Sequence, residues 1–187
     1  MSFKLLVLDV DGVLTNGRKV YDIDHKPLYK EYMCKDFTAI KRFIAAGVDV
    51  VMISGDNWNK AMAEKRNIPF FCTRDKNLSL DKSQYISLFE DQFGHDRRDI
   101  AFVGDDYFDL SMFQKLEWTF CPSDSPDIIK FNSKYNLESK GGEGVLVELY
   151  DLAEREKWLH PASMESVLEL DSKELSSADM SSLKPVV

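Results

Sequence analysis

The residues of this 187-residue chain best suited to chemistry are two aspartates, Asp9 and Asp11, which follow its first apolar run. In an extended segment, side chains two residues apart point the same way, so both carboxylates can face one reacting phosphate. One carboxylate can attack the phosphorus atom while its neighbour delivers a proton to the leaving oxygen. Gly12 lets the backbone turn away directly after the pair. The pattern therefore predicts phosphoryl transfer, although an acidic pair in a loop is by default a solvated turn or a helix cap.

Two later segments could hold the oxygens of a phosphoryl group. Ser54 and Gly55 end another apolar run and offer a hydroxyl and nearby amides. Lys82, at the start of a predicted helix, could supply a positive charge. Alone, each signal is weak, because a Ser-Gly pair after a strand is usually a turn and a single lysine is usually solvated surface.

A further segment gathers carboxylates that could bind a hard cation, namely Asp105, Asp106 and Asp109. Aspartates at helix starts commonly serve as caps, so this cluster also has a purely structural interpretation. The order of the four segments changes the balance, because three of them follow apolar runs that a doubly wound sheet would align side by side. We therefore expect one site, at the carboxyl ends of the strands.

The apolar pattern predicts strands that alternate with helices. Buried strands are expected at residues 3–10, 48–53, 70–72, 100–103 and 117–121. Helices are expected from Asp36, as the cap, to Gly47, and near residues 57–66, 80–93, 108–115 and 144–157. Residues 13–32 have the pattern of a projecting β-hairpin. The predicted fold class is α/β, a three-layer Rossmann-like parallel sheet with helices on both faces.

Length and composition predict one globular domain over residues 1–160. From Pro161 to Val187 the chain is rich in serine and acidic residues and poor in aromatics, which is typical of a flexible acidic tail or of a poorly packed appendage. The net charge of −8 disfavours nonspecific binding to nucleic acid or to an anionic membrane. Three widely spaced cysteines and the lack of a signal-peptide pattern lead us to expect a cytoplasmic protein.

In four places the chain resembles the haloacid dehalogenase superfamily. The matching motifs are Asp9-x-Asp11-Gly12-Val13-Leu14-Thr15, Ile53-Ser54-Gly55, Asp81-Lys82 and Gly104-Asp105-Asp106-x-x-Asp109-Leu110. More narrowly, the chain is similar to the small, capless phosphatases that act on 3-deoxy-D-manno-octulosonate 8-phosphate and related sugar-acid phosphates. The likeness runs from residue 3 to about residue 155 and includes the hairpin and the segment Gly141-Gly142-Glu143-Gly144.

The resemblance implies a magnesium-dependent phosphomonoesterase that works through an aspartyl-phosphate. Asp9 would be the nucleophile, and Asp11 would protonate the leaving alkoxide and then activate the hydrolytic water. Magnesium would be held by the carboxylates of Asp9 and Asp105 and by the backbone carbonyl of Asp11. No cap domain is expected over the site.

The resemblance also assigns supporting roles. Ser54, Gly55 and Lys82 would bind the phosphoryl oxygens, where negative charge accumulates in the transition state. Asp106 and Asp109 would orient metal-bound waters or Lys82. In that family, projecting hairpins bring four subunits together, so we expect a homotetramer here as well.

Several residues depart from the family pattern and bear on the substrate. Asp56 follows Ser54-Gly55 where the family commonly has arginine, and Val147 stands where it has another arginine. Phe37 and Ala39 occupy places that are usually glycine. The loss of two anion-binding arginines weakens the expectation of a carboxylated sugar phosphate. Other basic residues could compensate, and the candidates are Arg74, Lys76, Lys35 and Lys140.

The sequence thus favours a phosphatase for a sugar phosphate of the 3-deoxy-2-ulosonic acid type, an octulosonate or nonulosonate phosphate. Three alternatives remain. The chain could act on another small phosphomonoester, such as a nucleotide or a neutral sugar phosphate. It could be an idle relative that serves as an oligomerisation or regulatory domain, although such relatives typically lose motif carboxylates. A signalling receiver domain fits less well, because its lysine comes last in sequence and the Asp9-to-Thr15 loop is wrong for one.

Overall fold

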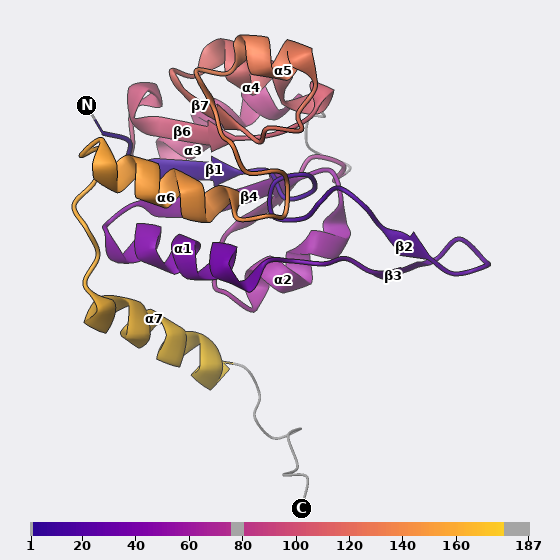
Figure 1. The fold of residues 1–187 in the computed structure, drawn as a ribbon, viewed down its shortest axis with the longest axis horizontal. Coiled ribbons are helices and arrows are strands. Elements are labelled where there is room, and N and C mark those ends of the chain that lie inside the picture. Colours follow the sequence, from indigo (N-terminus) through magenta and orange to yellow (C-terminus); the bar gives the residue numbers. More distant parts are fainter. Residues whose placement is uncertain (1, 76–80, 178–187) are drawn as a thin grey trace, which may run out of the picture.

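A six-stranded parallel sheet forms the centre of the protein (Figure 1). The computed structural model describes residues 2–75 and 81–177. The strands lie in the order β5-β4-β1-β6-β7-β8, and every neighbouring pair is parallel. Their bounds are Leu5–Leu8 for β1, Asp49–Ser54 for β4, Phe70–Cys72 for β5, Ile100–Val103 for β6, Trp118–Cys121 for β7 and Tyr135–Asn136 for β8. The chain moves outward from β1 in one direction and then in the other, so the strand order reverses beside β1, where such sheets bind ligands.

Helices cover both faces of the sheet, as predicted. One face carries α1 (Cys34–Ala45), α2 (Lys60–Glu64) and α6 (Val145–Arg155). The other carries α3 (Tyr85–Phe93), α4 (Leu110–Lys115) and α5 (Asp127–Asn132). Short 3-10 turns lead into several helices, and their bounds are Asn57–Asn59 for η1, Lys82–Gln84 for η2, Arg97–Asp99 for η3 and Tyr107–Asp109 for η4.

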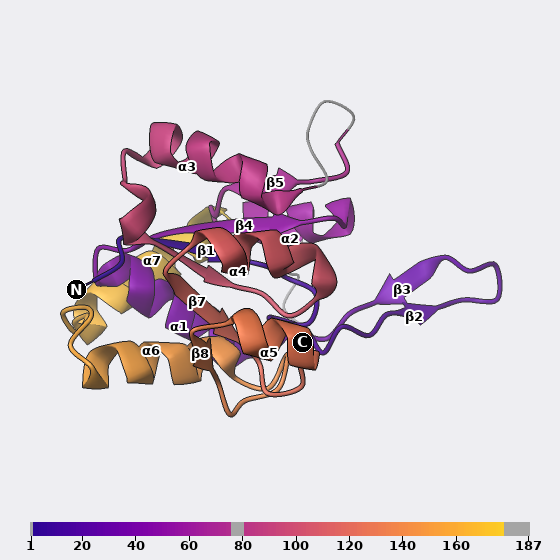
Figure 2. The ribbon, with the colours of Figure 1, turned by 90° about the horizontal axis from the view of Figure 1, so that it is seen from above.

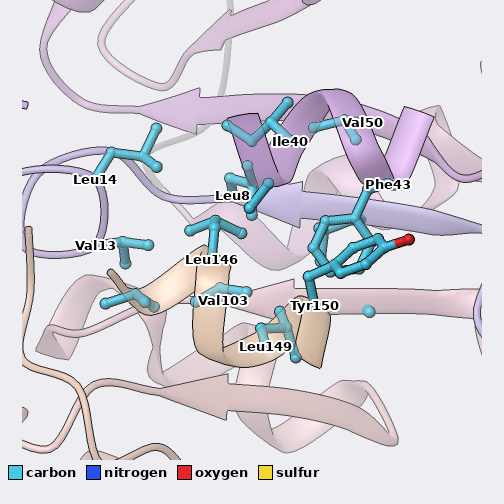
Figure 3. Packing of buried hydrophobic residues seen from close by; sticks show 14 of the residues in the cluster. Leu8, Val13, Leu14, Ile40, Phe43, Val50, Val103, Leu146, Leu149 and Tyr150 are labelled. Carbon is cyan, nitrogen blue, oxygen red and sulfur yellow. The ribbon is translucent and has the colours of Figure 1, made fainter. Parts of the chain in front are cut away.

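Successive side chains of β1 point to opposite faces of the sheet and contribute to two hydrophobic cores, one on each face. Leu6 and Leu8 pack on the α1/α6 side, and Leu5 and Val7 pack on the α3/α4 side. In Figure 3 the buried side chains of α1 and α6 interdigitate above the sheet, with the ring of Phe43 against that of Tyr150 at a centroid distance of 5.0 Å. Full burial of a large apolar side chain contributes about 1.5–3 kcal/mol each. This packing fixes the strands whose ends carry the candidate site.

A β-hairpin projects from the body, as both views show (Figures 1 and 2). It consists of β2 (Val20–Tyr21) and β3 (Pro27–Tyr29), which pair antiparallel. The predicted hairpin began at residue 13, but Val13 and Leu14 are buried in the α1/α6 core. The hairpin therefore starts later than the sequence indicated.

Asp36 was predicted to cap α1, and this was wrong. Met33 is the capping position of α1, and Asp36 lies within the first helical turn. The Asp36 carboxylate instead accepts the backbone N–H groups of Leu146 and Val147, at 2.8 and 3.2 Å, at the start of α6. A capping role across two helices is a tertiary contact that local sequence does not reveal.

The C-terminal segment also differs from the prediction of a flexible tail. Met164–Ser177 form helix α7, which lies beside α1 and places Val167 in the core (Figure 1). The Lys41 ammonium of α1 forms ion pairs with Asp171 and Glu174. Residues 178–187 of the predicted tail, and Leu80 at the predicted start of α3, lie outside the described residues. Helix α5 and strand β8 are short elements that the sequence did not predict.

Candidate active site

Asp9 lies directly after β1, in the middle of the sheet, and its carboxylate is buried. Its backbone N–H donates to the carbonyl of Val103 at 2.9 Å, which fixes it beside the end of β6. Its Oδ1 atom accepts a hydrogen bond from the Lys82 ammonium at 2.8 Å. Burial raises the pKa of Asp9 to about 7, Lys82 opposes the shift, and the nearby Asp109 carboxylate adds to it.

Lys82 joins two carboxylates at the floor of the site. Its ammonium also donates to Asp109 Oδ1 at 2.5 Å, and only 5% of its side chain is exposed. Burial alone would lower the pKa of Lys82, but the carboxylates of Asp109 and Asp9 outweigh it and raise the pKa above its ordinary value. The lysine is therefore a fixed positive charge beside the candidate nucleophile.

Both carboxylate oxygens of Asp109 accept hydrogen bonds from the protein. Its second oxygen, Oδ2, accepts the backbone N–H groups of Asp105 and Asp106 at 2.9 and 3.2 Å. Asp106 caps η4 through a 2.6 Å bond from the Tyr107 N–H. Both residues thus shape the loop after β6, as the structural interpretation of this cluster suggested.

Asp105 has capacity left for a cation. Its Oδ1 atom is buried and has no hydrogen-bond partner among the described residues. Burial raises the pKa of Asp105 to about 9, and Asp9 and Asp109 add to the shift. Carboxylate oxygens of Asp9, Asp105 and Asp109 lie within 4.8 Å of one another. A divalent cation beside Asp9 and Asp105 would offset this concentration of negative charge and satisfy the unpartnered oxygen, so these residues fit a metal.

The loop after β1 is shaped to bring the backbone against Asp105. Gly12 has φ +88°, and a Cβ atom there would lie 1.9 Å from Asp105 Oδ2. The buried Thr15 hydroxyl accepts the N–H groups of Gly12 and Gly17 at 3.3 and 3.2 Å, which closes the turn. Gly141 packs on the same loop, because its Cβ would lie 2.1 Å from the Gly12 carbonyl oxygen. Gly12 and Gly141 therefore both allow the backbone of the loop after β1 to pack closely against its neighbours.

Asp11 faces a different set of partners from those of Asp9. Its Oδ1 accepts from the Lys30 ammonium at 2.6 Å, and its Oδ2 accepts from the Asn59 amide at 3.0 Å. The Asp11 carboxylate is not part of the group that could hold a cation. Its predicted metal ligand is the backbone carbonyl, which this grouping of side chains does not test.

Ser54 ends β4 beside Asp9 and presents its hydroxyl to the site. Its Oγ accepts N–H groups from Asn59 and Asp56, both at 3.0 Å. A hydroxyl has two acceptor positions and one donor. With both acceptors used, its own hydrogen is left to donate to an anion such as a phosphate oxygen.

A cavity of about 210 Å³ opens above these groups. Its lining contains most of the predicted site residues together with basic residues from the rim; the members are Asp9, Asp11, Lys19, Ser54, Gly55, Asp56, Thr73, Arg74, Lys82, Asp106, Phe108 and Asp109. The Arg74 guanidinium lies against Gly55, because a Cβ atom added to Gly55 would be 3.1 Å from Arg74 Nε. Among the proposed compensating residues, Lys35 lines a separate hollow with Val147, and Lys76 lies outside the described residues.

Sequence reasoning missed Lys19, Lys30, Asn59 and Thr73. Lys30 belongs to the hairpin and Asn59 to η1, so only the folded chain brings them to Asp11. No local pattern marks either one. The sequence marked Ser54 because it ends an apolar run, but Asn59, five positions later, follows no such run.

Comparison with known proteins shows which phosphatases the chain is similar to. No family model matches it. The 3-deoxy-D-manno-octulosonate 8-phosphate phosphatase KdsC of Haemophilus influenzae is 28% identical over 159 residues, which cover 81% of this chain and 82% of the relative. KdsC of Escherichia coli is 26% identical over 155 residues, covering 81% and 79% of the two chains.

Solved structures agree with these relatives. The cobalt-bound phosphatase from Haemophilus influenzae has a TM-score of 0.74 at 27% identity and covers 83% of this chain and 86% of its own. A subfamily III A hydrolase of the haloacid dehalogenase superfamily from Legionella pneumophila has a TM-score of 0.73 at 26% identity, with 91% and 90% covered. The sheet and the projecting hairpin resemble those of haloacid dehalogenase superfamily hydrolases, with three of the four motifs at strand ends and Lys82 at the start of η2. The chain is thus similar to the KdsC phosphatases of that superfamily over about four fifths of its length.

Proposed function

We propose that the chain is a magnesium-dependent phosphomonoesterase that works through an aspartyl-phosphate on Asp9. One observation carries the proposal: the buried Asp9 carboxylate is oriented by Lys82 at 2.8 Å, beside the unpartnered Asp105 oxygen and at the floor of a cavity. A nucleophile, a fixed positive charge and a place for a cation thus meet at one point. We infer the roles of the side chains from this arrangement.

In the first half-reaction, an Asp9 carboxylate oxygen attacks the phosphorus atom. A bond forms between Asp9 and phosphorus as the bond from phosphorus to the sugar oxygen breaks, and Asp11 gives its proton to that leaving oxygen. Lys82 and the Ser54 hydroxyl hold the oxygens that carry the transition-state charge, and the backbone at Gly55 lines the same cavity.

In the second half-reaction, the Asp11 carboxylate takes a proton from water. The water oxygen attacks phosphorus, the bond to Asp9 breaks, and inorganic phosphate leaves. Asp9 returns as a carboxylate, and Asp11 holds the proton for the next substrate. The two aspartates therefore share the work, with covalent chemistry at one and proton transfer at the other.

Magnesium would be held by the carboxylates of Asp9 and Asp105, with the backbone carbonyl of Asp11 as a further ligand. When bound, it offsets the repulsion between the anionic nucleophile and the anionic phosphate. Asp106 and Asp109 would act as supporting groups. The contacts of Asp109 with Lys82 and with the amides of Asp105 and Asp106 support this role for it.

For the substrate, we propose a sugar phosphate of the 3-deoxy-2-ulosonic acid type, an octulosonate or nonulosonate phosphate. Lys19 and Arg74 line the cavity and could receive a second anionic group in place of the missing arginines. One observation favours another small phosphomonoester, because Asp56 adds a negative charge to the same rim. The idle-relative alternative is not favoured, because Asp9, Asp11, Ser54, Lys82 and Asp105 all lie at one site.

The hairpin supports the proposal of a homotetramer. Its apolar side chains are exposed in the single chain, with Ile23 fully exposed and Leu28 and Tyr29 about half exposed. Such a surface indicates a protein interface. Sedimentation is expected to show four chains per particle, and a monomer at micromolar concentration would refute this proposal.

In the described part of the chain no helix combines the length and apolarity needed to span a bilayer. We also propose a cytoplasmic location, with which the free thiols of Cys34, Cys72 and Cys121 are compatible.

The test is phosphate release from a panel of sugar, sugar-acid and nucleotide monophosphates, with magnesium and with chelator. We expect magnesium-dependent turnover that Asp9→Asn abolishes, and the best substrate of the panel identifies the class. Absence of turnover from folded, metal-loaded protein would contradict the proposal and favour the idle-relative alternative.

A further inference from the structure

The Asp11 carboxylate is held from two sides by residues far apart in the sequence. Lys30 comes from the hairpin, just after β3, and donates to Oδ1 at 2.6 Å. Asn59 comes from η1, after β4, and donates to Oδ2 at 3.0 Å. Because each oxygen has its own donor, the carboxylate is fixed in rotation as well as in place.

The ammonium group of Lys30 is buried and has a hydrogen-bond acceptor for each of its three N–H groups. Its side chain is only 2% exposed, and its ammonium contacts Asp11 Oδ1, Asp56 Oδ2 and Asn59 Oδ1 at 2.6, 2.8 and 2.8 Å. An ammonium has three N–H donors, and three acceptors take them. A buried ammonium needs such compensation, so the contacts fix where the hairpin lysine lies.

Asp56 gives this lysine its second carboxylate. Asp56 Oδ2 accepts from Lys30 at 2.8 Å and forms an ion pair with Lys19 at 2.6 Å, while its Oδ1 accepts the Trp58 N–H at 3.0 Å. The negative charges of Asp11 and Asp56 are therefore balanced by the positive charges of two lysines, Lys19 and Lys30. An arginine at position 56, as in the related family, would bring a second cation against Lys30. The acidic residue at this departure from the family pattern is thus matched to Lys30.

Asn59 has one possible orientation. Its Oδ1 accepts from the Lys30 ammonium at 2.8 Å and from the Tyr32 hydroxyl at 3.2 Å. A flipped amide would point N–H groups at an ammonium, which cannot accept. The Asn59 Nδ2 group must therefore face Asp11 and Ser54, which links the proton-transfer group to the phosphate-binding hydroxyl.

We infer that Lys30, Asn59 and Asp56 are positioning residues that hold the Asp11 carboxylate toward the leaving-group oxygen of the substrate. The inference rests on the proposed function, in which Asp11 protonates that oxygen. Lys30 and Asn59 act directly on Asp11, and Asp56 acts through Lys30. Among the described residues, the side-chain hydrogen bonds of this network go to Asp11 and Ser54, whereas Asp9 is bound by Lys82.

This role makes a chemical prediction that a merely structural role does not. A poor leaving group must be protonated as its bond to phosphorus breaks, whereas a good leaving group departs as the anion. Loss of Asp11 positioning should therefore slow a substrate with a poor leaving group and spare one with a good leaving group. The ratio kcat/KM isolates this step, because it includes only events up to release of the leaving group.

The experiment compares phenyl phosphate with p-nitrophenyl phosphate, which have similar shapes and very different leaving groups. Lys30→Met and Asn59→Ala are assayed with magnesium, beside Lys60→Met, which changes an exposed lysine whose ion pair within the described residues is with Glu64. For both test variants, kcat/KM on phenyl phosphate is expected to fall by about 10- to 100-fold, part of the range of general acid catalysis. On p-nitrophenyl phosphate, kcat/KM of Lys30→Met should change little. Asn59→Ala also loses a hydrogen bond to Ser54 Oγ, so its kcat/KM on p-nitrophenyl phosphate should fall too, but by less than on phenyl phosphate. Lys60→Met should match the wild type on both. Asp56→Asn should show the same selective loss to a smaller degree.

Urea unfolding of each variant shows whether it is folded, and Asn59→Ala carries the test if Lys30→Met is not. An equal loss on both substrates, or no loss on either, would overturn the inference. Failure of the proposed function is distinguishable, because in that case the wild-type protein would hydrolyse neither substrate in the presence of magnesium.

Discussion

Asp9 and Asp11 are two residues apart, yet their surroundings differ in almost every respect. Asp9 is buried directly after β1, and its partner Lys82, which Asp109 also binds, comes from η2 beside the sheet. Asp11 is half-buried at the edge of the cavity and is held by Lys30 from the hairpin and by Asn59 from η1. One half of the site belongs to the sheet, and the other half is assembled from loops.

The difference suits two kinds of chemistry. A covalent nucleophile must keep its position during the reaction, and the sheet gives Asp9 a rigid frame. A proton-transfer group must face the leaving oxygen and later a water molecule, and Lys30 and Asn59 hold the Asp11 carboxylate in that direction from two loops. We therefore expect substitutions in the sheet half to abolish activity on all substrates and those in the loop half to change activity selectively.

Lys82→Met should produce the largest effect and test this division most severely. It leaves the buried carboxylates of Asp9 and Asp109 without a cation, which costs about 3–5 kcal/mol of folding free energy. Turnover of phenyl phosphate and p-nitrophenyl phosphate should be lost alike. Urea unfolding and both assays measure the effect, with Lys60→Met as a control expected to stay within about 0.5 kcal/mol of the wild type. Selective loss on phenyl phosphate alone would erase the distinction between the two halves.

Asp105→Asn should give an effect of opposite sign with and without metal. Without magnesium it removes a buried carboxylate that lies near Asp9 and Asp109 and has an unpartnered oxygen, so Tm should rise by roughly 2–4 °C, equivalent to about 1 kcal/mol. With magnesium the wild type should gain stability and the variant should gain little. Thermal unfolding in magnesium and in chelator measures both. If magnesium stabilised the two proteins equally, Asp105 would not be a ligand.

Lys19→Met should have the smallest effect on stability. Its ion pair with Asp56 is partly exposed, with 27% and 23% of the two side chains accessible, and such pairs contribute about 0–1 kcal/mol. Because Lys19 lines the cavity, KM for sugar-acid phosphates should rise while KM for p-nitrophenyl phosphate stays close to that of the wild type. Steady-state assays on both classes decide the matter. A parallel rise for the two substrates would place Lys19 at the phosphoryl group instead of at the substrate's second charge.

The same division explains how much of the molecule was predictable. The strands at residues 70–72 and 100–103 were predicted with their observed bounds, because short apolar runs between turns leave little choice. Ser54 ends β4, and Asp9 and Asp105 follow β1 and β6. These three strands are neighbours in the sheet, so the position of each residue at its strand end is enough to bring them together.

The loop half could not be predicted in this way. Contacts between Asp11 and Lys30, or between Asp36 and the start of α6, join segments whose meeting depends on the whole fold. Helix α7 shows the same limit, since its serine-rich sequence is typical of a tail and only packing on α1 gives it a place. Local patterns predict what a segment can form, and they do not predict which side chain it will meet.

The central claim is that covalent chemistry belongs to Asp9 and proton transfer to Asp11. Asp11→Asn should still accept the phosphoryl group from p-nitrophenyl phosphate but should release it slowly, since the base that activates water is gone. Acid quenching followed by mass spectrometry of proteolytic peptides measures where the phosphoryl group is. We expect it on Asp9, accumulated in Asp11→Asn and absent from Asp9→Asn. A phosphoryl group on another residue, or turnover without any covalent intermediate, would contradict the account.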